Sequence, residues 1–160
     1  MAAAHQLEEN NSLKEEIWVK ASTKGTAEYK AIEVLLKGIE IKLPNNETFL
    51  DAGKHKRDAI RVKWWETGAK TYRDYALVHK EAIQTISENS LSGNKIVPEY
   101  LETEKPVFFG HYWFSDEPKI LKSNVACLDY SAGKKDKLVA YQWNDGDSEL
   151  SKDGFIWVDS

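Results

Sequence analysis

The chain has 160 residues, 41% of them hydrophobic and 30% charged, which fits one globular domain and excludes a disordered chain. Its net charge of −4 disfavours a surface that neutralises nucleic-acid phosphates, and no apolar run is long enough to span a membrane. The single cysteine, Cys127, excludes an intrachain disulfide and a cysteine-rich zinc site. Since the first residues also have no basic and apolar leader pattern, we expect a cytoplasmic protein with neither nucleic acid nor a membrane as partner.

The N-terminal region predicts a flexible terminus followed by a short helix. Residues 1–11 are small and polar and are expected to form a flexible N-terminus, so residues 12–160 hold the fold. Ser12 and Glu15 have the spacing of a capping box, in which each side chain bonds the other residue's backbone amide. Apolar residues at helical spacing follow, and they predict a helix over about 13–21.

The next segment has the strongest helix signals in the chain. Thr26 is the expected N-cap, and Lys37 with Gly38 is typical of a helix end. Between them, apolar residues recur every three or four positions, which predicts one buried stripe along the helix. The residues of this stripe are Tyr29, Ile32, Leu35 and Leu36.

The middle of the chain alternates between strand-like and polar stretches. Apolar and charged residues alternate over 39–43, which predicts a half-buried strand. The residues over 60–65 predict a second strand with one apolar face and one face that is basic and aromatic. The polar residues 45–56 between them are expected to form a loop. Residues 71–77 fit either a strand or a loop, and residues 81–88 predict a short helix with its apolar side turned inward.

Three apolar runs near the C-terminus are rich in β-branched and aromatic residues and predict strands of one sheet. They are Pro106–His111, Val125–Ser131 and Lys137–Trp143. A short polar turn at Gly133–Asp136 predicts that the last two runs form an antiparallel hairpin. With a final strand at Phe155–Val158, the predicted fold class is α+β, with helices beside a mixed or antiparallel sheet.

Six segments of the chain, taken in order, resemble the end of a calcineurin-like metallophosphoesterase in one bacterial branch of that superfamily. They are Ala27–Gly38, Arg61–Trp65, Thr71–Leu77, Lys105–Trp113, Asn124–Ser131 and Lys137–Trp143. The fourth segment contains Gly110–His111 at the end of its strand, and this pair resembles the last metal-binding motif of the superfamily. The resemblance implies that the chain corresponds to the C-terminal half of the αββα sandwich of these enzymes.

Members of this superfamily are phosphohydrolases in which two divalent ions, Mn, Fe or Zn, activate a water molecule for attack on phosphorus. The resemblance implies that His111 is a metal ligand and that the complete enzyme acts on a phosphorylated substrate. The motifs Asp-x-His, Gly-Asp-x-x-Asp and Gly-Asn-His do not occur in this chain, and Trp113 stands where many members have a second histidine. We therefore expect no tightly bound metal in the chain alone, and a missing N-terminal half as its partner.

Two arginines are candidates for substrate binding, because a guanidinium fits the geometry of a phosphate group. Arg61 lies on a predicted strand, and Arg73 lies in the ambiguous segment 71–77. A salt bridge or an exposed strand face explains both residues more simply. Four aromatic residues allow a similar choice: Trp64, Trp65, Tyr112 and Trp113. They either form a stacking surface for a nucleobase or, as we favour, pack, in the core or against the missing half.

Two other interpretations stay open beside a fragment of a phosphohydrolase. One is a non-catalytic interaction module, since a half sandwich exposes an apolar sheet that favours self-association. The other is a small-molecule-binding domain that uses the basic and aromatic segment Arg61–Trp65. The sequence therefore leaves open whether the chain is itself an enzyme.

Overall fold

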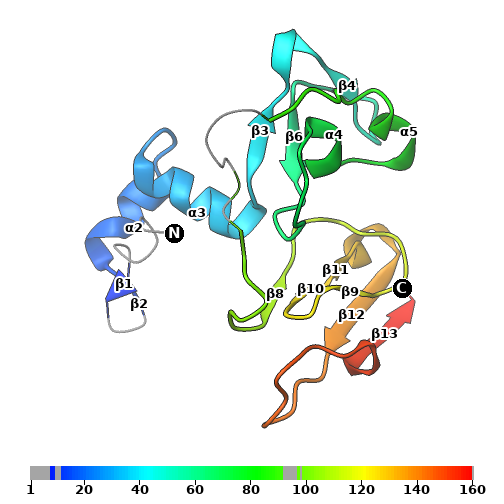
Figure 1. Ribbon diagram of the computed structural model, residues 1–160. Coiled ribbons are helices and arrows are strands. Elements are labelled where there is room, and N and C mark those ends of the chain that lie inside the picture. Colours follow the sequence, from blue (N-terminus) through cyan, green and yellow to red (C-terminus); the bar gives the residue numbers. More distant parts are fainter. Residues whose placement is uncertain (1–7, 10–11, 92–96, 98, 160) are drawn as a thin grey trace. The chain divides into compact units, whose positions relative to one another are not determined.

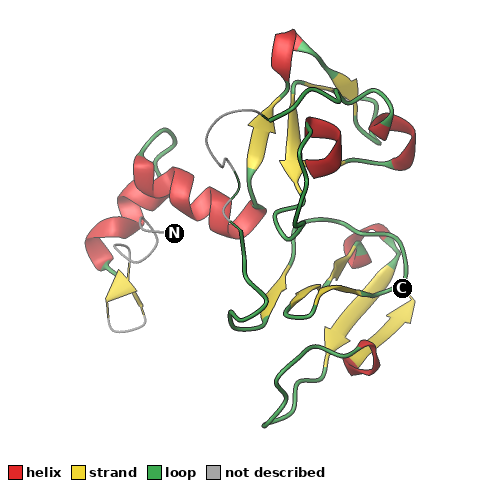
Figure 2. Ribbon diagram, in the orientation of Figure 1, coloured by secondary structure: helices red, strands yellow, loops and turns green. Residues whose placement is uncertain are grey.

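The structure is a computed structural model that describes residues 8–9, 12–91, 97 and 99–159. It divides into two compact units, and the boundary between them in the sequence lies between Gly38 and Ile39. Figure 2 shows helices and small separate sheets, so the fold class is α+β, as the sequence predicts. Within the described residues, no helix is long and apolar enough to cross a membrane.

The N-terminal unit is a pair of helices preceded by a short hairpin (Figure 1). Its elements are strands β1 (Glu8–Glu9) and β2 (Ser12–Leu13), which pair antiparallel, and helices α2 (Glu15–Ser22) and α3 (Ala27–Lys37). The predicted cap of α3 is confirmed, because the Thr26 hydroxyl accepts a hydrogen bond from the Tyr29 amide over 3.1 Å. Of the predicted flexible N-terminus, residues 1–7 and 10–11 lie outside the described residues.

Two details of this unit differ from the sequence prediction. The capping box at Ser12 is wrong, since Ser12 belongs to β2 and Lys14 precedes α2 without a side-chain cap. The buried stripe of α3 is also wrong, since Leu35 and Leu36 are 60% and 65% exposed. Two short helices offer each other only one packing partner, so much of the apolar surface of α3 stays uncovered within the unit.

The second unit begins with a three-stranded antiparallel sheet in the order β3–β6–β7. Its strands are β3 (Glu40–Lys42), β6 (Ala59–Val62) and β7 (Ala76–Leu77). Ile41 pairs with Ile60, so their side chains share one face, and Val62 shares it two residues further along β6. The two alternating strands predicted from the sequence are confirmed, each somewhat shorter than its pattern.

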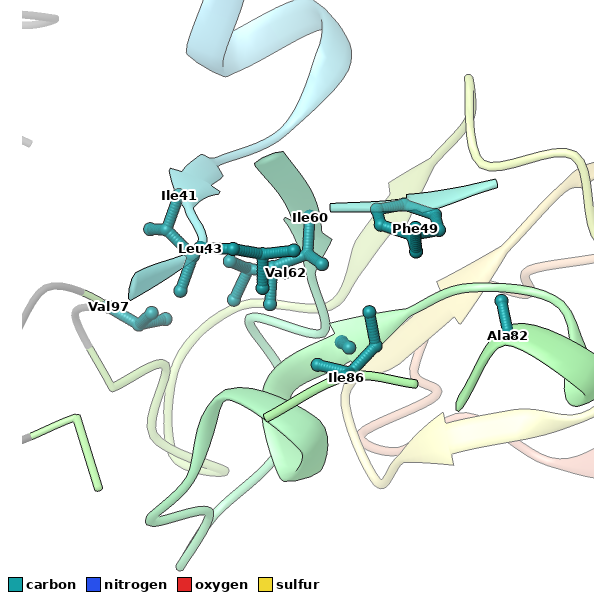
Figure 3. Packing of buried hydrophobic residues seen from close by; sticks show 9 residues of the cluster. Ile41, Leu43, Phe49, Ile60, Val62, Ala82, Ile86 and Val97 are labelled. Atoms are coloured by element: carbon teal, nitrogen blue, oxygen red, sulfur yellow. The ribbon is translucent and has the colours of Figure 1, made fainter. Parts of the chain in front are cut away.

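The apolar face of this sheet builds the main core of the unit (Figure 3). Ile60 and Val62 are fully buried, and helix α5 (Lys80–Ile83) with the residues after it adds Ala82 and Ile86. Figure 3 shows these side chains converging from the strands and from the segment around α5. The buried members of the main core are Ile41, Leu43, Phe49, Ile60, Val62, Ala76, Ala82, Ile86 and Val97.

The predicted loop 45–56 contains a hairpin. Strands β4 (Phe49–Leu50) and β5 (Lys56–Arg57) pair antiparallel within it. Asp51 in the connecting turn accepts a hydrogen bond from the His55 amide, and this bond is the main reason why the pKa of Asp51 is lowered to about 2. A polar sequence thus folds locally because a carboxylate collects the free amides of its own turn.

The ambiguous segment 71–77 divides into helix α4 (Tyr72–Tyr75) followed by β7. Thr71 and Asp74 form a capping box, in which the Thr71 hydroxyl accepts from the Asp74 amide and the Asp74 carboxylate accepts from the Thr71 amide. The helix predicted over 81–88 is shorter in the structure, where α5 spans only Lys80–Ile83.

The C-terminal part of the unit holds two further three-stranded sheets. One has the order β8–β10–β9, in which β10 is parallel to β8 and antiparallel to β9. The other is antiparallel in the order β11–β12–β13 and is called the C-terminal sheet. The strands are β8 (Val107–Phe109), β9 (Ile120–Lys122), β10 (Val125–Cys127), β11 (Asp129–Tyr130), β12 (Lys137–Tyr141) and β13 (Phe155–Asp159).

The prediction that three apolar runs share one sheet is wrong. The run Val125–Ser131 divides at Leu128, whose amide donates to the Phe109 carbonyl over 2.9 Å. Before this point β10 pairs with β8, and after it β11 pairs with β12. All of Val125–Cys127 is fully buried, so no polar position marks the change of partner. The predicted hairpin is confirmed, with the 3-10 turn η2 (Ala132–Lys134) as its connection, and so is the final strand, β13.

Replacing Ile60 with alanine is expected to lower the free energy of unfolding by about 2–4 kcal/mol, because the change leaves a cavity in the main core. Urea unfolding followed by circular dichroism measures the loss. Leu50→Ala on β4, where the leucine is 55% exposed, is the control and should cost less than about 1 kcal/mol. Equal losses for the two variants would contradict the packing of Ile60.

Candidate functional site

The turn after β8 carries the candidate site and is called the His111 turn (residues 110–114). Within it, His111 and Trp113 have φ values of 67° and 50°. Residues other than glycine rarely adopt this left-handed region, and each one costs on the order of 1 kcal/mol. The conformation therefore needs contacts outside the turn that hold it in place.

Arg61 on β6 holds the turn from one side. Its Nη1 donates to the His111 carbonyl oxygen over 2.6 Å, and its Nη2 pairs with the Glu40 carboxylate at 3.0 Å. Glu40 lies opposite Arg61 in the register of β3 and β6, so the sheet fixes this pair. The Arg61 Nε is buried without a hydrogen-bond partner among the described residues, so these two bonds set the direction of the guanidinium.

Asp129 on β11 holds the turn from the other side. Its carboxylate accepts hydrogen bonds from the amides of Trp113, over 3.3 Å, and of Ser131, over 3.1 Å. Its backbone carbonyl accepts a third bond, from the Phe114 amide over 3.0 Å. The turn is thus attached to the sheet β3–β6–β7 through Arg61 and to the C-terminal sheet through Asp129.

Aromatic side chains from the turn and from the segment after β6 form one packed cluster, called the aromatic cluster. Trp65 and Tyr112 are buried with ring centres 5.5 Å apart, and Trp64 packs edge-on against Trp65. The Tyr112 hydroxyl donates to the Val62 carbonyl over 3.3 Å, and burial raises the pKa of Tyr112 to about 12. Core filling is therefore confirmed for Trp65 and Tyr112, with Trp64 partly buried against them, whereas Trp113 is 55% exposed and does not fill the core.

Among the described residues, the predicted metal ligand His111 is not part of a group of possible metal ligands. Across 8–9, 12–91, 97 and 99–159, no three His, Cys, Asp or Glu side chains lie close enough to hold a metal ion together. The Asp129 carboxylate is engaged by two backbone amides. Since Mn, Fe and Zn sites take about four or more ligands, these residues by themselves do not fit such a site.

Of the two arginines predicted to bind substrate, Arg61 lies at the His111 turn and Arg73 makes its contacts elsewhere. Arg73 in α4 donates to the carbonyl oxygens of Ile86 and Gln84 over 2.9 and 3.2 Å, and it pairs with the Glu88 carboxylate. These bonds tie α4 to the segment after α5, which is the role that the salt-bridge alternative gives to Arg73.

Lys134 is a contributor to the site that the sequence does not indicate. Its ammonium nitrogen lies 4.1 Å from the centre of the Trp113 ring, and the centre of the His111 ring lies 5.5 Å from the same point. Lys134 belongs to η2, in the hairpin of the C-terminal sheet. No local pattern signals a contact between residues so far apart in the chain.

Comparison with known proteins adds no relative, since no family model, no curated protein and no solved structure matches the chain. The resemblance to metallophosphoesterases therefore rests on the six sequence segments. A function for the chain has to follow from the chemistry of the His111 turn and from the surfaces of the sheets.

The thiol of Cys127 is expected to be unreactive in the folded protein. Cys127 is fully buried beside Trp65 and Tyr112, and burial raises its pKa to about 12, so almost no thiolate exists at pH 8. Dithiobis-nitrobenzoate should react slowly with the native chain and rapidly in urea. A Ser115→Cys variant, whose new thiol is exposed, controls for the reagent. Rapid modification of Cys127 in the native chain would contradict the packing of the aromatic cluster.

Proposed function

We propose that the chain is the C-terminal part of a metal-dependent phosphohydrolase domain of the metallophosphoesterase type. In this proposal His111 is one ligand of a two-metal site that hydrolyses phosphate esters or anhydrides, and a second segment supplies the other ligands. The observation that carries the proposal is an uncovered apolar face of the C-terminal sheet, which extends to the residue that anchors the His111 turn. A cytoplasmic location is part of the proposal.

The uncovered face is formed by residues that pair directly and therefore point the same way. Leu138 pairs with Val158 and Ala140 pairs with Ile156, and these four residues are called the outer face. Leu138, Ile156 and Val158 are 62%, 56% and 60% exposed. Val139 and Phe155 point to the opposite face and are buried, whereas Trp157 on that face is 39% exposed. Both faces of these strands thus carry apolar residues, and the outer face is the more exposed one.

Strands that are apolar on both sides are typical of sheets that are covered on both sides. A Leu, Ile or Val side chain gains about 1.5–3 kcal/mol when it is fully buried, so the outer face favours a covering segment. Asp129 is in register with Leu138 and shares its face, while its carboxylate holds the Trp113 amide. A segment that covers the outer face therefore also lies beside the His111 turn.

The partner in this proposal is a complementary N-terminal half with the motifs Asp-x-His, Gly-Asp-x-x-Asp and Gly-Asn-His. Packed on the outer face, it completes an αββα sandwich, and its carboxylates and histidines join His111 around Mn, Fe or Zn. Arg61 restrains the backbone that carries the imidazole, because it holds the His111 carbonyl. The residues of this chain thus position one ligand for a site that is built jointly.

A second candidate is a non-catalytic interaction module that self-associates through the same outer face. The four side chains of the face are uncharged, and a twofold axis lets the exposed side chains of two copies meet one another. Among the described residues β13 is also an edge strand, so one of its sides is open to pairing with a second copy. Association of this kind needs no metal ligand, which separates the two candidates.

The isolated chain is expected to hydrolyse neither bis(4-nitrophenyl) phosphate nor 4-nitrophenyl phosphate with Mn²⁺, because His111 alone cannot fix two ions. Fusion of a metallophosphoesterase N-terminal half that carries the three missing motifs is expected to give Mn²⁺-dependent hydrolysis of at least one of these esters. In the fusion, removal of the metal with EDTA should abolish turnover, and His111→Ala should lower kcat by about 100-fold.

The matched control is His55→Ala, since His55 is exposed on the β4–β5 hairpin and its loss should leave the activity of the fusion unchanged. Metal-dependent turnover by the isolated chain that His111→Ala abolishes would show that the chain builds its own site. A folded fusion that stays inactive with Mn²⁺, Fe²⁺ and Zn²⁺ would also contradict the proposal.

The isolated chain is expected to form dimers or larger assemblies at high concentration, because its outer face is uncovered. Size exclusion with light scattering measures the mass. The double change Leu138→Lys and Ile156→Lys should shift the mass toward the monomer, since unpaired charges resist burial between two faces. Leu101→Lys, at a position 49% exposed outside the sheet, is the control. A stable monomer of the unsubstituted chain would contradict association through this face.

A further inference from the structure

Trp113 differs from the other aromatic residues near the His111 turn. Trp64, Trp65 and Tyr112 each pack against several aromatic rings, whereas among the described residues the only ring in contact with Trp113 is that of His111. Trp113 is 55% exposed and adopts a left-handed conformation that its anchor, Asp129, holds in place. The core does not use this ring, so its position calls for another reason.

The surroundings of Trp113 combine an open ring with positive charge. The Lys134 ammonium lies 4.1 Å from the ring centre, a geometry that cations adopt over an aromatic face. Lys135 follows on the same exposed turn, whereas Lys137 is paired with Asp136 at 2.9 Å. The Asp129 carboxylate is turned to backbone amides. A flat aromatic surface and the Lys134 ammonium group therefore lie side by side, and the His111 ring is next to them.

We propose that Trp113 and Lys134 bind a phosphate ester of a planar aromatic group, such as a nucleoside monophosphate. The aromatic group stacks on the Trp113 face that Lys134 covers in the free chain, and the displaced ammonium pairs with the phosphate. The phosphate end of the ligand then lies toward His111. The inference rests on the proposed function for the choice of a phosphate ester, and it names the class of substrate that this site selects.

The relative strengths of the contacts favour the exchange. A cation over an exposed aromatic ring stabilises by a factor of roughly 2 to 5, whereas stacking of a nucleobase on an aromatic side chain contributes roughly 5- to 150-fold in affinity. Lysine is suited to the move, because its ammonium is a compact charge on a flexible stem. The ligand thus replaces a weak contact with a stronger one and retains the lysine as a phosphate partner.

The test is isothermal titration calorimetry on the full chain without metal ions, with AMP, ribose 5-phosphate and adenosine as ligands. AMP is expected to bind roughly 5- to 150-fold more tightly than ribose 5-phosphate, which lacks the planar group. Trp113→Ala should remove this preference, and Trp113→Tyr should keep part of it. Lys134→Ala should remove the preference for AMP over adenosine, and it should raise the affinity for adenosine roughly 2- to 5-fold, because no cation then has to leave the Trp113 face.

Matched controls are Trp18→Leu, at a tryptophan 56% exposed on α2, and Lys152→Ala, at an exposed lysine; neither should change AMP binding. Circular dichroism checks that each variant is folded. Absence of AMP binding at 10 mM ligand, equal affinity for AMP and ribose 5-phosphate, or a preference for AMP over ribose 5-phosphate that survives Trp113→Ala would each overturn the inference. Since no metal is present, these outcomes are separate from the hydrolysis assay that tests His111.

Discussion

The candidate site depends on one hydrogen bond, from Arg61 Nη1 to the carbonyl oxygen of His111. It joins β6 to a turn 50 residues further along the chain, and its guanidinium is held in turn by Glu40. A hydrogen bond from a charged group contributes about 1.5–3 kcal/mol, which is comparable with the cost of two left-handed residues. Together with the bonds to Asp129, it allows a turn to persist that its own residues disfavour.

Packing in the aromatic cluster determines where the side chains of the His111 turn point. Tyr112 is buried against Trp65, and its two neighbours in the turn, His111 and Trp113, are left nearer to solvent. Because Tyr112 is buried, the side chains of its neighbours His111 and Trp113 are directed away from the core. Because Val125–Cys127 is also fully buried and belongs to the strand that pairs with β8, the base of the turn is a buried part of the fold.

Asp129 connects the two surfaces from which a function is inferred. Its carboxylate bonds the Trp113 amide, and its place in β11 sets it beside Leu138 on the outer face. A segment that covers this face therefore lies next to His111, whether it brings metal ligands or only apolar contacts. Trp113, with Lys134 over its ring, is bonded to Asp129 through its amide. A ligand bound by Trp113 and Lys134 would therefore lie close to the proposed metal site.

The sequence by itself determined the local features of this protein. The cap at Thr26, the alternation that builds β3 and β6, and the hairpin from Asp129 onward depend on neighbouring residues, whose patterns are visible in the chain. Only the tertiary structure decided that Val125–Ser131 divides between two sheets, because a fully apolar run pairs equally well with either partner. It also decided the contacts of His111 with Arg61 and of Trp113 with Lys134. These join residues from distant segments, and no spacing rule links such positions until the sheets are packed.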